Sequence, residues 1–384
     1  MLCVGALAGA AGAAPFLPQS DRQVLEVLPA RAADPRMREL RELRRELAGN
    51  PRDLDVAVRL ARRYHEEVAA EGDPRYIGYA QAALAPWWNE ADPPPQARVM
   101  RAILLQFSHQ FDAALADLQA AVATDPANGE AWSWSAAIHM VRADYAPARQ
   151  ACEQFRPYAS PLIGVACLAS VDSVTGRAGA AAAALRSALD AAPGAPPAEQ
   201  LWALTRLAET EERRGEHAAA EAAYRRALAL GLADGYLLAA YADFLLDRGR
   251  AGEVLALLKD KSRSDLLLLR LALAAQATGD PALPAWREEL AARFAAARLR
   301  GDSVHQKEEA RFALALEGQA ERALALALAN YAVQREPADA RIVLEAALAA
   351  KQPQAAQPVL KWMADSGVES VALASLAQQL KVLK

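Results

Sequence analysis

The sequence contains few aromatic residues and no long uninterrupted apolar run. Aromatic side chains make up 6% of the 384 residues, whereas the apolar set makes up 53%, much of it alanine. Alanine favours helices and is depleted in strands, so this composition argues against an all-β fold. No run of 18 residues is drawn from the apolar amino acids alone, so no membrane-spanning helix is predicted.

An excess of basic residues is also lacking. The chain has 43 Lys and Arg against 47 Asp and Glu, for a formal net charge of −4. Proteins that neutralise nucleic-acid phosphates generally present a basic face. We therefore expect no nucleic-acid partner.

Motifs of catalytic and metal centres are missing as well. No HExxH, GxSxG, phosphate-binding P-loop or strand-led GxGxxG occurs. The histidines are too scattered for metal-ligand spacing, at positions His65, His109, His139, His217 and His305. We expect neither an enzyme nor a cofactor or metal site.

The first residues have the outline of a secretory signal peptide. Residues 2–14 carry no charge, and Ala11-Gly12-Ala13 supplies the small residues of a cleavage site. This pattern predicts that residues 1–13 are removed. No Lys or Arg precedes the apolar run, as it would in a typical signal peptide. Two alternatives stay open: a start upstream of Met1, or a cytosolic protein with an uncharged N-terminus.

Only Cys152 and Cys167 remain if residues 1–13 are removed. Ser160-Pro161 lies between them and indicates a turn between two helices. In an antiparallel helix pair, both thiols would lie roughly 10–12 Å from that turn. A disulfide is therefore possible if both face the seam. The alternative is a pair of small buried thiols.

A pattern with a period of about 34 residues runs through the middle of the chain. One copy places Trp132, Ala136, Ala148 and Phe155 at set intervals. Cleaner copies follow at Leu207-Ala208, Gly215, Ala220, Tyr224 and Ala227, and at Tyr241-Ala242, Gly249, Val254 and Leu258. Small residues recur at the eighth and twentieth positions of each unit. The pattern resembles the tetratricopeptide repeat (TPR), although Ser135 and His139 depart from it.

The resemblance implies an all-α, right-handed superhelical solenoid of antiparallel helix hairpins, each with a helix A and a helix B. We expect eight or nine hairpins in the repeat array. One unit cannot bury both of its faces alone, so the hairpins should stack to form a common core. The predicted organisation is a signal peptide over 1–13, an N-terminal extension and capping helix over 14–50, the repeat array over 51–367 and a C-terminal capping helix over 368–384.

TPR proteins mostly capture a peptide or partner domain on the concave face lined by helix A. Their carboxylate clamp uses Lys and Asn in helix A, but the first lysine here is Lys259, so this clamp is not predicted. The concave positions of the central units supply candidates for partner binding: Trp202, Arg206, Glu209, Tyr236 and Asp243.

A second candidate group lies outside the repeat pattern. Arg75 and Tyr79 follow an enlarged turn, and Trp87 and Trp88 are adjacent in the chain. Such side chains can form an anchor pocket at an interface. The alternative is that the rings pack on the N-terminal cap.

The main hypothesis is a non-catalytic scaffold of the bacterial periplasm that binds a peptide or a partner domain. The expected partner is another envelope protein. Arg outnumbers Lys 36 to 7, as is typical of GC-rich bacterial genomes. A second hypothesis is a structural subunit of a membrane-attached envelope assembly, bound through its outer face or through Trp87-Trp88. A third is a cytosolic TPR regulator.

Overall fold

The computed structural model describes residues 34–71, 73, 75–301 and 306–383. All regular secondary structure in these residues is helical. The predicted signal peptide over 1–13, and the extension as far as residue 33, lie outside the described residues.

The described helices pair into nine consecutive antiparallel hairpins. The first helix is α1 (Pro35–Gly49), and a short helix α4 (Ala85–Trp88) follows the first hairpin. Hairpins one to three are α2 (Leu54–Glu71) with α3 (Arg75–Ala83), α5 (Pro95–Phe107) with α6 (Phe111–Thr124), and α7 (Gly129–Val141) with α8 (Tyr145–Phe155). Hairpins four to six are α9 (Pro161–Asp172) with α10 (Ala178–Ala191), α11 (Pro197–Arg214) with α12 (His217–Ala229), and α13 (Gly235–Asp247) with α14 (Ala251–Leu258).

Three more hairpins and one closing helix complete the chain. They are α15 (Asp265–Thr278) with α16 (Leu283–Leu299), α17 (Gln306–Ala315) with α18 (Ala320–Val333), α19 (Pro337–Ala349) with α20 (Gln357–Ser366), and the closing helix α21 (Val371–Val382). The first helix of each hairpin contacts the first helix of the next. The expected all-α solenoid of eight or nine hairpins is confirmed.

Local sequence signals fix where the helices begin and where hairpins turn. Asn128 and Asp234 act as N-caps, accepting hydrogen bonds from the backbone N–H of Ala131 at 3.0 Å and of Leu237 at 2.7 Å. Gly215 ends α11 in the left-handed conformation, with φ at 82°. A side chain there would be strained in conformation and would also meet Val371 of α21.

Small residues at the repeat positions let the helices pack closely. Ala136, Ala208 and Ala242 lie in the first helices of their hairpins and are fully or almost fully buried. Tyr224 and Phe244 are also fully buried and fill the remaining space, with ring centroids 5.6 Å apart. Each hairpin therefore needs its neighbours to complete its core, as the repeat pattern predicts.

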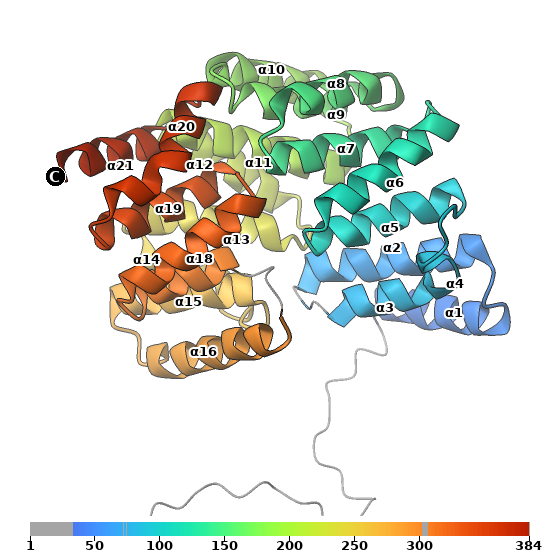
Figure 1. The fold of residues 1–384 in the computed structure, drawn as a ribbon, viewed down its shortest axis with the longest axis horizontal. Helices are drawn as coiled ribbons and strands as arrows, with labels where there is room; N and C mark the ends of the chain where they lie inside the picture. Colours follow the sequence, from blue (N-terminus) through green and yellow to red (C-terminus); the bar gives the residue numbers. More distant parts are fainter. Residues whose placement is uncertain (1–33, 72, 74, 302–305, 384) are drawn as a thin grey trace, which may run out of the picture.

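The C-terminal repeats fold back against the central ones (Figure 1). Trp362 of α20 donates its indole N–H to the Tyr145 hydroxyl of α8 at 2.9 Å. The backbone N–H of Arg335 donates to the Val141 carbonyl at 2.7 Å. The backbone N–H of Ala178, at the start of α10, donates to the Glu369 carboxylate at 2.8 Å. The solenoid thus closes on itself, and α17, α19 and the start of α21 come to face α11 and α13.

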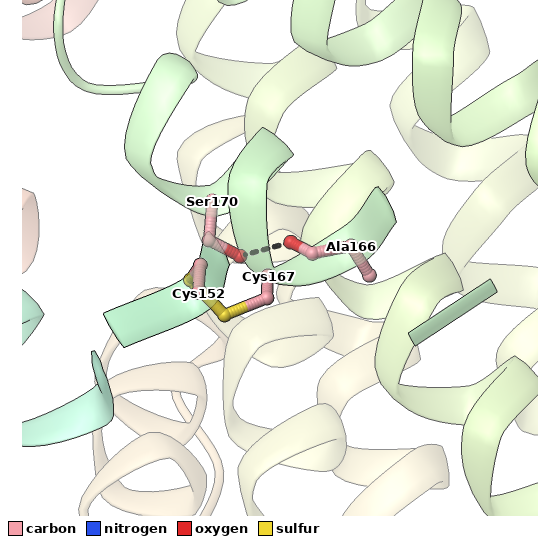
Figure 2. The surroundings of a disulfide bond; sticks show 4 residues. All are labelled: Cys152, Ala166, Cys167 and Ser170. Atoms are coloured by element: carbon pink, nitrogen blue, oxygen red, sulfur yellow. Dashed lines mark hydrogen bonds between the residues drawn. A yellow bond between two sulfur atoms is a disulfide. The ribbon is translucent and has the colours of Figure 1, made fainter. Parts of the chain in front are cut away.

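A disulfide joins two neighbouring hairpins. Figure 2 shows Cys152 of α8 bonded to Cys167 of α9, with Ser170 donating its hydroxyl to the Ala166 carbonyl at 2.8 Å. The two Cα atoms are 5.6 Å apart, and both cysteines are buried in one apolar cluster. Because α9 also supplies part of the cavity wall described next, the bridge helps to fix that wall.

Candidate functional site

A cavity of about 580 Å³ lies between the central and the C-terminal repeats. Side chains of α11 and α13 form one wall, and side chains of α17, α19 and the first turn of α21 form the facing wall. Both apolar and charged side chains line the cavity. The apolar ones include Val174, Ala239, Ala240, Ile342 and Leu373.

The α11 wall carries a cluster of charged and aromatic groups. Arg206 and Glu209 are one helical turn apart and form an ion pair at 3.1 Å. The Arg206 guanidinium lies 4.9 Å from the centroid of the Tyr236 ring, in cation–π geometry. The Tyr236 hydroxyl donates to Glu209. These three side chains hold one another in place, so this part of the cavity is preorganised.

The α13 wall is tied to the C-terminal repeats by two carboxylates. Asp243 accepts hydrogen bonds from Arg270 of α15 at 2.7 Å and from Arg311 of α17 at 2.5 Å. Burial alone would raise the pKa of Asp243, but the two guanidinium groups outweigh burial and lower that pKa well below its ordinary value. Asp247 accepts hydrogen bonds from both terminal nitrogens of Arg341 on α19, at 2.5 and 2.8 Å.

A buried acid pair caps α19 beside the cavity. Asp339 is fully buried and accepts hydrogen bonds from the Glu336 backbone N–H and from the Asn330 side chain, both at 2.9 Å. Lys307 lies 3.6 Å from the same carboxylate. Burial raises the pKa of Glu336 and of Asp339, and the charge of Asp339 raises the pKa of Glu336 further. Lys307 and the Glu336 backbone N–H oppose the rise at Asp339.

Glu212 of α11 lines the cavity and has no basic partner in the described residues. It accepts a hydrogen bond from the Tyr224 hydroxyl at 2.9 Å. Burial raises the pKa of Glu212 to about 7, and the nearby charges of Asp247, Glu209 and Asp243 act in the same direction. Near neutral pH this carboxyl group therefore changes charge inside the cavity wall.

This shift predicts a pH-dependent stability. The folded-state pKa of about 7 exceeds the ordinary value of 4.5, so between these values the folded chain binds the extra proton. The free energy of unfolding should therefore fall as pH rises through this window. Between pH 5 and 8 the free energy of unfolding should fall by on the order of 2 kcal/mol more for the native chain than for the Glu212→Gln variant. Urea unfolding at a series of pH values measures this difference.

Glu216→Gln is the matched control, because Glu216 is an exposed carboxylate just beyond the end of the same helix. It should follow the native pH profile. Parallel profiles for the native chain and Glu212→Gln would contradict the prediction.

Four of the sequence candidates come together in this cavity. Arg206, Glu209, Tyr236 and Asp243 all line it. Trp202 does not: it is partly buried and packs against the core clusters of the neighbouring repeats. For this residue the expectation of a groove position is corrected, since its large apolar ring fills the seam between hairpins.

The second candidate group does not form an anchor pocket. Trp87 is 5% exposed and belongs to the core cluster of the first hairpins, with Trp88 packed against it. Arg75 pairs with Asp73, and the exposed ring of Tyr79 lies 5.6 Å from the ring of buried Tyr64. The alternative, that the tryptophans pack on the N-terminal part, is therefore correct. Because Trp87 is buried, it cannot be the outward contact of a membrane-attached assembly, whereas attachment through the outer face stays a prediction.

The sequence analysis did not predict the facing wall of the cavity, which α17, α19 and the first turn of α21 form. Its charged side chains come from the C-terminal repeats: Lys307, Arg311, Arg335, Glu336 and Arg341. One signal was present in the sequence, because charged residues recur on the first helices of these late hairpins. Their meeting with α11 and α13 depends on how far the solenoid turns.

The described chain contains no helix long and apolar enough to cross a bilayer. Within the same residues, no group of three His, Cys, Asp or Glu side chains is arranged to hold a metal ion. The sequence expectations of no enzyme, no cofactor and no metal stay predictions.

Consecutive helix hairpins, their period and their buried small residues decide the fold family. The fold is TPR-like. No protein-family model matches the sequence, and no curated protein sequence matches it.

Solved structures similar to this TPR-like chain are distant ones. A tetratricopeptide repeat protein from Parabacteroides merdae shares 11% identity, with 74% of this chain and 98% of that chain covered and a TM-score of 0.39. Yeast Tom70 shares 13% identity, with 90% and 62% covered and a TM-score of 0.44. The human IFIT1 dimer with m7Gppp-AAAA shares 15% identity, with 90% and 85% covered and a TM-score of 0.43. At these identities nothing about a ligand or partner follows, and the expectation of no nucleic-acid partner stays a prediction.

Proposed function

We propose that the chain is a non-catalytic scaffold that holds an extended segment of a partner protein in the cavity between α11, α13 and the C-terminal repeats. The cavity itself is the observation that carries this proposal. Its volume of about 580 Å³ lies within the range of roughly 300–1,000 Å³ typical of ligand sites. It also lies on the first helices of the hairpins, where the TPR resemblance places partner capture.

The composition of the walls suits a peptide segment. Apolar side chains such as Val174 and Leu373 can cover side chains of the segment, while charged groups can pair with its backbone and polar groups. The ion pairs of Asp243 and Asp247 hold the two walls together before any ligand binds. Such preorganisation lowers the entropy cost of binding.

Replacing Tyr236 by alanine should weaken capture of the partner strongly. Tyr236 is 48% exposed within the cavity wall, so its ring can contact a ligand and its loss leaves the core largely intact. An aromatic anchor of this kind contributes about 2 kcal/mol to binding, which corresponds to an affinity about 30-fold weaker. Crosslinked affinity capture from fractionated cells, followed by titration of the captured partner, measures the effect.

Tyr158→Ala is the matched control, because Tyr158 is 51% exposed and does not line the cavity. It should capture the partner as the native chain does. Equal capture by Tyr236→Ala and Tyr158→Ala would show that the cavity is not the binding site.

We further propose that the chain works in the bacterial periplasm and that its partner is another envelope protein. The disulfide between Cys152 and Cys167 supports this location, because such bonds persist outside the reducing cytosol. The signal-peptide pattern of residues 1–13 supports it too. The intact mass of the chain from fractionated cells should correspond to a bridged chain without those 13 residues. An uncleaved, reduced chain in the cytosolic fraction would favour the cytosolic regulator instead.

A further inference from the structure

The charges of the cavity are not fully matched within the protein. Arg206, Arg270, Arg311, Arg341 and Lys307 each face a carboxylate, as described above. Three further arginines that line the cavity have no carboxylate within ion-pair distance in the described part of the chain. These are Arg213, Arg248 and Arg335.

Arg213 is the most confined of the three. Its guanidinium donates to the hydroxyls of Ser173 at 2.8 Å and Thr210 at 3.4 Å, which are neutral acceptors. Its Nε atom is buried without a hydrogen-bond partner among the described residues. Burial lowers the pKa of Arg213, and Glu209 opposes this effect only in part. The positive charge of this side chain is therefore poorly compensated by the protein.

Arg335 approaches the same region from the C-terminal repeats. It lies between α18 and α19, and its backbone is anchored to the end of α7 through the Val141 carbonyl. Its side chain is exposed to the cavity and has no hydrogen bond or ion pair in the described structure. Burial raises the pKa of the Tyr145 hydroxyl to about 12, while the charges of Arg213 and Arg335 both lower it. Tyr145 lines the cavity together with Arg213 and Arg335, and its hydrogen bond with Trp362 joins α8 to the C-terminal repeats.

We propose that Arg213 and Arg335 form a carboxylate-binding site at this end of the cavity, and that the bound segment presents an acidic side chain to it. The inference rests on the proposed function and names the group that the scaffold recognises. Guanidinium groups match carboxylates in geometry and form charge-assisted hydrogen bonds with them. Val174 and Leu373 line the same cavity and suit apolar neighbours of the acidic residue.

The charge of the ligand group is limited by the acidic side chains of the same cavity. Among the described residues, eight Lys and Arg side chains and seven Asp and Glu side chains line the cavity, so the excess of positive charge is small. A single carboxylate matches this excess better than a group with several negative charges, such as a triphosphate. Because one arginine comes from α11 and the other from the connection before α19, the site exists only while the C-terminal repeats are closed on the central ones.

The test is a selection of eight-residue peptides from a random library against the full-length chain. The peptides carry blocked termini, so that any carboxylate comes from a side chain. Binders are assigned to the cavity if Tyr236→Ala weakens them and Tyr158→Ala does not. We expect these binders to share Asp or Glu at one position. Changing that residue to Asn or Gln should weaken binding to the native chain about tenfold or more.

Arginine variants then identify the side chains that bind the carboxylate of the peptide. In Arg335→Gln and in Arg213→Gln the preference for the acid over the amide should fall below about twofold, because one charged partner is lost. The Arg335 side chain has no hydrogen bond or ion pair to lose in the described structure, so its variant should fold normally. Arg226→Gln is the control, since Arg226 is an exposed arginine of α12 outside the cavity. It should keep the preference.

The outcomes separate this inference from the proposed function. Cavity binders without a shared acidic residue would overturn the carboxylate site and leave the scaffold proposal standing. The carboxylate site would also be overturned if Arg213→Gln and Arg335→Gln both kept the native preference for the acidic peptide over its amide counterpart. Absence of any binder that depends on Tyr236 would count against both proposals. Binding only by peptides with a free C-terminus, measured in a second library, would contradict the side-chain source of the carboxylate.

Discussion

Asp243→Ala should lower the free energy of unfolding by about 3–5 kcal/mol, because it leaves a buried cation without its partner. The Arg270 side chain is only 8% exposed, and Asp243 accepts two hydrogen bonds from it. The same carboxylate also holds Arg311 of α17. The C-terminal repeats should therefore loosen before the central ones unfold. Urea unfolding gives the total loss, and hydrogen exchange should show faster opening in α17 and α19.

Two further variants test this cause. Asp190→Ala removes an exposed carboxylate of α10 that has no ion pair in the described residues, and it should change stability by less than about 0.5 kcal/mol. Asp243→Leu combined with Arg270→Met removes the buried charge together with its partner and should recover much of the loss. If Asp243→Ala unfolds at the same urea concentration as Asp190→Ala, the ion pairs of Asp243 do not hold the repeats together.

Replacing both Cys152 and Cys167 by alanine should lower the free energy of unfolding by about 3 kcal/mol. The bridge spans 15 residues, so it restricts the unfolded chain, and its loss restores that freedom. Thermal and urea unfolding of the oxidised chain, the reduced chain and the double variant measure this loss. The reduced chain should resemble the double variant.

Ser170→Ala controls for substitution beside the bridge. Ser170 lies one turn beyond Cys167 on α9 and makes only a local hydrogen bond to the Ala166 carbonyl (Figure 2). This variant should retain nearly all of the stability. Equal stability of the oxidised and reduced chains would show that the bridge does not stabilise the fold, and it would weaken the case for work outside the cytosol.

The helix hairpins could be predicted from the sequence because their causes are local. Caps such as Asn128 and Asp234, and turn glycines such as Gly215, act within a few residues of the positions they control. The small residues of successive hairpins meet because neighbouring units stack, so they recur with the period of the repeat. All of these signals can be read within about two repeat lengths of sequence.

The site was predictable only on one side. Arg206, Glu209, Tyr236 and Asp243 occupy set positions on the first helices of their hairpins, so the repeat register placed them on one face. The register could not distinguish a tryptophan that packs between hairpins from one that faces a ligand. For that reason the groove position predicted for Trp202 was wrong, and for Trp87 the alternative of packing on the N-terminal part is correct.

The sequence by itself determined that this protein is a helical solenoid, where its hairpins turn and which residues line the first helices of its central units. Only the tertiary structure decided that the solenoid closes and encloses a cavity. The contacts that close it join residues 68, 94 and 191 positions apart: Arg311 with Asp243, Arg341 with Asp247, and Glu369 with Ala178. The repeat pattern does not predict which residues meet across such separations, because their meeting depends on small rotations that accumulate from one repeat to the next.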